Sequence, residues 1–112
     1  MKNFIIIFSV LIITSCTIIR PPLIWGLTHE IAKVDEEFDL RVKEKFPVGT
    51  NEDQVIKLLK NQFFKVKDKE NGGSAYFDVM QIACSIRYSI GWHTNKDKKI
   101  VSIGASVNHS CL

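Results

Sequence analysis

The chain has 112 residues, of which 46% are hydrophobic and 24% charged, with a formal net charge of +3 and three cysteines. This composition fits one small globular domain and excludes collagen-like, disordered and multi-pass membrane proteins. A chain this short also leaves little room for a second domain with a deep cleft, because most of its buried surface must belong to one core.

The first fifteen residues have the order of a bacterial export signal. Lys2 supplies a positive start, and residues 4–13 form a hydrophobic stretch in which only Ser9 is polar. A helix needs about 20 residues, most of them apolar, to cross a bilayer, whereas the stretch over residues 4–19 is only sixteen residues long. We therefore expect a lipoprotein signal peptide over residues 1–15, with an uncleaved membrane anchor as the alternative.

Residues 13–16, Ile-Thr-Ser-Cys, resemble the lipobox of bacterial lipoproteins. The resemblance implies diacylglycerol on the Cys16 thiol, cleavage before Cys16, and acylation of the new amino terminus, for example with palmitate. Two or three acyl chains hold a protein on a membrane far more firmly than one. Thr17, in place of Asp, resembles lipoproteins sent to the outer membrane, so the lipid of Cys16 is expected on its periplasmic side. The alternative is an ordinary cysteine beside an apolar helix.

Residues 16–27 are expected to form a lipid-anchored tether. Pro21 and Pro22 prevent a helix there, and the stretch shows neither a helical nor a strand period. Two interpretations of Trp25 stay open. Its indole lies at the lipid interface beside Leu23 and Ile24, or it packs on the domain as a first core residue.

A small domain is expected over residues 28–112, beginning with two helices. Thr28 is placed to cap a first helix from about His29, and its apolar stripe recurs at steps of three and four: Leu27, Ile31, Val34, Phe38 and Val42. Thr50 and Asp53 have the spacing of a capping box for a second helix. Its expected buried face consists of Val55, Ile56, Leu58 and Leu59.

Strands follow the helices. Residues 63–67 read as a first strand, in which Phe63 and Phe64 cannot both point inward, and residues 68–73 read as a turn. Residues 80–93 alternate apolar and polar side chains, which predicts a long second strand, and residues 100–111 predict its return partner. The fold class is therefore α+β: two N-terminal helices packed on a three-stranded antiparallel β-meander.

The last hairpin predicts a register and a disulfide. Its two apolar faces coincide only when the numbers of paired residues add to an odd sum, and a loop over residues 96–99 sets that sum at 195. The expected pairs are Asn95 with Ile100, Trp92 with Ile103, Ile90 with Ala105, Tyr88 with Val107, and Cys84 with Cys111. Export to an oxidising compartment favours a Cys84–Cys111 disulfide, and two buried free thiols are the alternative.

No catalytic or cofactor motif occurs in the sequence. His29, His93 and His109 lie far apart without metal-ligand spacing. We therefore expect neither an enzyme nor a cofactor or metal. A net charge of only +3 behind an export signal also makes nucleic acid a poor partner.

The expected order of anchor, tether, two helices and antiparallel strands resembles the SmpA/OmlA family of small outer-membrane lipoproteins. Residues 48–50, 54–55, 58–59 and 99–101 carry the resemblance. It implies a protein-binding or scaffold role in the cell envelope, with a membrane anchor through Cys16 and an unidentified envelope protein as partner. The alternative is a periplasmic inhibitor or immunity-type lipoprotein that blocks an enzyme or toxin.

Overall fold

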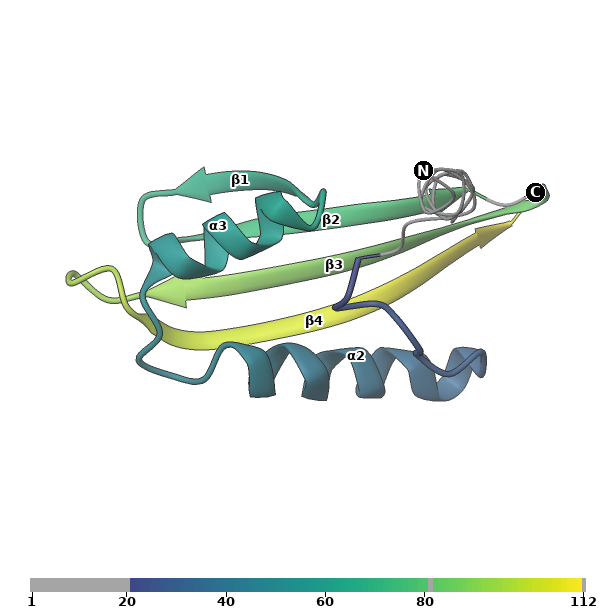
Figure 1. Ribbon diagram of the computed structural model, residues 1–112, viewed down its shortest axis with the longest axis horizontal. Coiled ribbons are helices and arrows are strands. Elements are labelled where there is room, and N and C mark those ends of the chain that lie inside the picture. Colours follow the sequence, from purple (N-terminus) through teal and green to yellow (C-terminus); the bar gives the residue numbers. More distant parts are fainter. Residues whose placement is uncertain (1–20, 81, 112) are drawn as a thin grey trace, which may run out of the picture.

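The computed structural model describes residues 21–80 and 82–111, and they form an α+β domain (Figure 1). Its elements are α2 (Ile31–Lys45), α3 (Glu52–Asn61), β1 (Lys65–Lys69), β2 (Gly72–Met80), β3 (Cys84–Thr94) and β4 (Ile100–Cys111). The strands form one antiparallel sheet in the order β1-β2-β3-β4. The predicted signal peptide and Cys16 lie outside the described residues. No helix in the described part of the chain is long and apolar enough to cross a membrane.

The sheet has four strands, so the prediction of a three-stranded meander is wrong. The helices also do not stand at the N-terminus, since the first of the two described begins at Ile31. The predicted turn over residues 68–73 contracts to Glu70 and Asn71, and β2 begins at Gly72. The physical reason is close packing: a Cβ on Gly73 would come within 2.6 Å of the Trp92 ring. Gly72 and Gly73 read as turn residues in the sequence, but they begin a strand that packs closely against Trp92.

The β3–β4 register is confirmed over most of its length. Tyr88 pairs with Val107, Trp92 with Ile103 and Cys84 with Cys111. The predicted pairing of Asn95 with Ile100 is wrong, because the register shifts after His93 and Thr94 pairs with Ile100 instead. The bulge leaves Val101 without a facing residue and 47% exposed, although its odd number would put it on the same face as Ile103 and Val107 in a regular strand.

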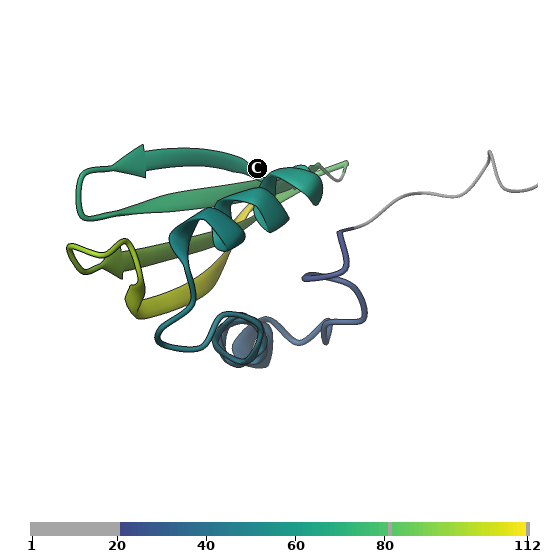
Figure 2. The same cartoon turned by 60° about the vertical axis from the view of Figure 1, so that its left-hand side comes forward.

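One face of the sheet carries the core. Its buried side chains from the helices are Val34, Phe38, Val42, Val55 and Leu59, and those from the sheet include Ala75, Ile90, Trp92, Ile103 and Val107. α2 runs along β4, and α3 lies over the β1–β2 side (Figures 1 and 2). The indole N–H of Trp92 donates to Glu52 Oε2 over 2.8 Å inside this core, which links the start of α3 to the middle of the sheet.

Both helices begin differently from the prediction. The Thr28 hydroxyl accepts a hydrogen bond from the Glu30 N–H at 3.3 Å, and α2 starts after it at Ile31, which is 66% exposed. The Thr50 hydroxyl donates to the carbonyl of Pro47 at 2.6 Å, so it does not cap α3. Each threonine stabilises the turn before its helix, because a hydroxyl can bond to nearby backbone groups as readily as to the first helical turn.

Two carboxylates of α2 accept hydrogen bonds from the outer edge of β4. The backbone N–H of Ala105 donates to Asp39 Oδ1 over 2.8 Å, and that of Val107 donates to Asp35 Oδ1 over 2.6 Å. Burial raises the pKa of Asp39, but the bonds from Lys43 and the Ala105 N–H outweigh it, and the pKa lies below the usual 3.8. The edge of the sheet is thus held by an ionised side chain.

We expect Asp39→Ala to lower the free energy of unfolding by about 1–2 kcal/mol at pH 7, because the Ala105 N–H loses its acceptor. The pKa of Asp39 is lower in the folded chain, so its contribution is present above pH 3.8 and is lost as the pH falls through the lower folded value. Urea unfolding at several pH values measures both effects. Asp97→Ala, which removes an exposed carboxylate of the β3–β4 turn, is the control; equal losses in the two variants would contradict the assignment.

Candidate functional site

Residues 21–28, here called the leading segment, pack on the domain. This is the second half of the stretch expected to form a tether. Leu23, Ile24 and Leu27 are all buried in the core cluster. A turn begins the segment, with the Ile24 N–H donating to the Pro21 carbonyl at 3.0 Å. Only residues 17–20 remain between the expected lipid anchor at Cys16 and the folded domain.

Arg41 of α2 holds the leading segment in place. One of its guanidinium nitrogens, Nη1, donates to the carbonyl oxygens of Leu23, at 3.2 Å, and of Trp25. The side chain of Gln62, just after α3, accepts the Leu23 N–H at 2.9 Å, and Glu37 lies 3.8 Å from the Arg41 guanidinium. The backbone polar groups of the segment are therefore satisfied by side chains of the domain, as a packed segment requires.

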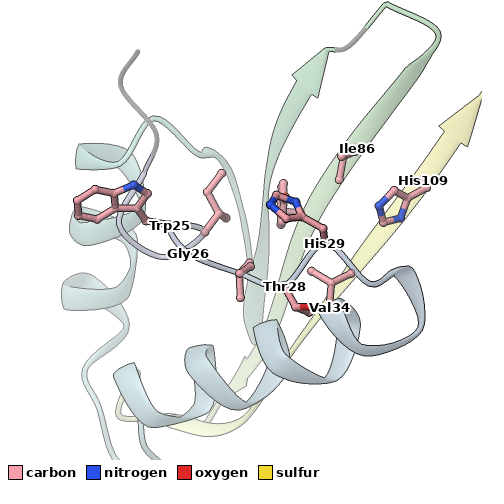
Figure 3. A pocket seen from close by; sticks show the side chains of 10 residues that line it. Trp25, Gly26, Thr28, His29, Val34, Ile86 and His109 are labelled. Atoms are coloured by element: carbon pink, nitrogen blue, oxygen red, sulfur yellow. The ribbon is translucent and has the colours of Figure 1, made fainter. Parts of the chain in front are cut away.

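Trp25 differs from its neighbours on the leading segment. It is 71% exposed, whereas Leu23 and Ile24, which precede it in the same turn, are each 4% exposed. Trp25 is also among the residues that line the cavity between the leading segment and the sheet, where Figure 3 shows its indole well apart from the two histidines. The interpretation of Trp25 as a core residue is therefore wrong, and Leu23 and Ile24, which were expected beside it at the lipid interface, are instead part of the core.

A cavity of about 410 Å³ lies between the leading segment, the start of α2 and the sheet. Its apolar wall includes Leu27, Val34 and Ile86, and His29 and His109 also line it, at the end away from Trp25 (Figure 3). From the sequence alone, the histidines were not expected to lie near one another. The signal for this juxtaposition was the odd number of His109, which places it on the same face of β4 as Ile103 and Val107.

The chemistry available in this cavity is limited. Two imidazoles fall short of the three or four protein ligands of a zinc site, and the described residues contain no group of three or more His, Cys, Asp or Glu side chains placed to hold a metal ion. The Thr28 hydroxyl already accepts the Glu30 N–H. The third histidine, His93, lies beside Gly72 and Gly91 at the other end of β3, so it does not complete the set.

The other notable feature is the end of the β2–β3 hairpin, here called the apolar tip and defined by Met80 and Ile82. Met80 is 79% exposed and Ile82 fully exposed at 106%. A disulfide joins Cys84 to Cys111 directly beside them, with Cα atoms 4.0 Å apart. This is the pairing expected from the register, at a position where cross-strand side chains approach most closely. The covalent bond braces the tip.

No protein-family model, curated protein or solved structure matches this chain.

We expect reduction of the Cys84–Cys111 bond to lower the free energy of unfolding by about 3–4 kcal/mol, the chain-entropy value for closing a loop of this length, since the cysteines are 27 residues apart. Urea unfolding with and without a reducing agent measures the loss. The double variant Cys84→Ser/Cys111→Ser should be as stable as the reduced protein and insensitive to reductant. If both cysteines react with an alkylating agent in the native, oxidised protein, the disulfide is absent.

Proposed function

We propose that this chain is a bacterial lipoprotein, held on the periplasmic side of the outer membrane by lipid on Cys16, whose domain binds another protein of the cell envelope. The export signal and the Cys16 motif support the location. The resemblance to the SmpA/OmlA family supports the same setting without naming a partner. The observation that carries the binding role is the apolar tip.

The apolar tip has the properties of a protein-binding anchor. Met80 and Ile82 are large, apolar and almost wholly exposed, and they lie together around a shallow hollow of about 250 Å³. Burying such side chains in a partner is worth about 1.5–3 kcal/mol each. The disulfide beside them holds the strand ends together, so little conformational freedom remains to be lost on binding. Polar Ser85 and Ser110 border the hollow, as at the rim of an interface.

A second candidate is the inhibitor or immunity-type role, and one observation favours it. The end of the β2–β3 hairpin projects beyond both helices in two views (Figures 1 and 2). A narrow, covalently braced projection with apolar side chains fits a cleft better than a flat surface. Under this candidate the partner is a periplasmic enzyme or toxin whose activity falls when the apolar tip enters its cleft.

The location is tested with Cys16→Ala. We expect the natural chain to be processed and to carry acyl chains on its first residue, because a lipobox cysteine is both the cleavage and the attachment point. Membrane fractionation and mass spectrometry of the purified protein measure both properties. The variant should keep residues 1–15 and carry no lipid. A natural chain that retains its first fifteen residues and an unmodified Cys16 would contradict the lipoprotein proposal.

The binding role is tested with Met80→Ser/Ile82→Ser. We expect the double variant to capture its envelope partner at least tenfold less well, since each lost apolar contact is worth about 1.5 kcal/mol or more, with unchanged urea unfolding. The readout is chemical cross-linking in intact cells followed by affinity purification. Val48→Ser, at a 73% exposed apolar residue of the α2–α3 turn, is the matched control. If both variants retain the same partners, the apolar tip is not the binding site.

A further inference from the structure

We infer that Trp25 seats the domain on the bilayer, so that the exposed side of the leading segment contacts the lipid headgroup region. This inference rests on the membrane anchorage in the proposed function and adds a contact surface to it. The occupant of the surface is lipid, and the following distances and contacts support that choice over a protein.

The connection between Cys16 and the folded domain is short. Cys16 and Pro21 are five residues apart, and five residues span at most about 18 Å even when fully extended. Pro21 itself is buried on the domain. Whatever the conformation of the connection, an anchor at Cys16 keeps this part of the domain within about 18 Å of the membrane surface. The same limit holds if residues 4–19 form an uncleaved anchor, because that anchor ends even closer to Pro21.

Trp25 lies close to the point where the anchored chain enters the domain. Trp25 follows Pro21 within a tight turn, in which the Ile24 N–H donates to the Pro21 carbonyl at 3.0 Å and the Trp25 N–H donates to the Pro22 carbonyl at 3.3 Å. Arg41 then fixes the Trp25 carbonyl against α2. The indole is therefore carried on a rigid support next to the point where the anchored chain meets the domain.

The indole of Trp25 also suits contact with the lipid headgroup region. Tryptophan is enriched at membrane interfaces, because its ring is apolar and its N–H can bond to water or headgroups. Trp25 is 71% exposed, Pro22 and Gly26 of the same turn are also exposed, and residues 21–26 contain no charged side chain, so the turn itself does not oppose contact with lipid. One indole would bind a membrane weakly by itself. On a short tether it acts at a millimolar effective concentration or more, and a weak contact becomes occupied.

The two tryptophans allow a direct test. The full chain is expressed, purified from membranes and placed in vesicles of phosphatidylethanolamine and phosphatidylglycerol, with or without bromine on the upper acyl chain. We expect brominated lipid to quench most of the emission that Trp25→Phe removes, and we expect aqueous iodide not to quench it. Trp92 is 2% exposed and bonded to Glu52, so its emission should respond to neither quencher and serves as the internal reference.

The possible results separate the two proposals. Quenching of Trp25 by iodide and not by brominated lipid overturns the seating. Protection of Trp25 from both quenchers also overturns it, because a protein or a second copy then covers the indole. Mass spectrometry of the same sample reports whether Cys16 is lipidated. An unprocessed chain refutes the lipoprotein proposal, while the quenching still reads out the position of Trp25, since residues 4–19 then hold the chain on the vesicle.

Discussion

The arrangement of the whole domain depends on how α2 holds the edge of the sheet. Asp35 and Asp39 are one helical turn apart, a rise of about 6 Å, and alternate residues of a strand are about 6.8 Å apart. The two carboxylates can therefore reach the outward N–H groups of Val107 and Ala105 together. This spacing sets the helix antiparallel to β4 and brings its apolar stripe over the sheet. It also covers an edge that would otherwise be open to pairing with another chain.

The same helix positions the leading segment. Arg41 belongs to the next turn of α2 after Glu37, on a different side from the carboxylates that face β4, and it bonds to the carbonyls of Leu23 and Trp25. α2 thus has sheet on one side and the leading segment on another. Because both attachments are to one rigid helix, the position of Trp25 relative to the sheet is determined, and an anchored domain has a defined side toward the membrane.

Regular patterns within one segment of the sequence predicted more of the structure than could be inferred about contacts between separate elements. Strict alternation along β3 and β4 predicted the Cys84–Cys111 pairing. The strand expected over residues 63–67 begins only at Lys65, and Phe63 lies in the turn after α3 with a φ of 66°, so the exposure of Phe63 (67%) and the burial of Phe64 (4%) do not arise from strand alternation. β2 was missed because its two initial glycines read as a turn. Their real constraint is Trp92, a residue distant in sequence, whose backbone lies against Gly72 and whose ring lies against Gly73. The bulge that exposes Val101 and the cavity shared by His29 and His109 likewise depend on contacts between elements, which no local pattern records.

The apolar tip and the leading segment belong to the same end of the domain. The cavity under the leading segment is lined by Ile86 and His109, which face each other across β3 and β4 two residues from the Cys84–Cys111 pair. That disulfide borders the hollow beside Met80 and Ile82. If Trp25 rests on lipid, the apolar tip is held near the bilayer rather than deep in the periplasm. A partner that buries it then needs an apolar surface close to the membrane, which an integral outer-membrane protein or a second lipoprotein provides and a freely diffusing periplasmic toxin does not. The seating of Trp25 therefore favours the scaffold role over the inhibitory one.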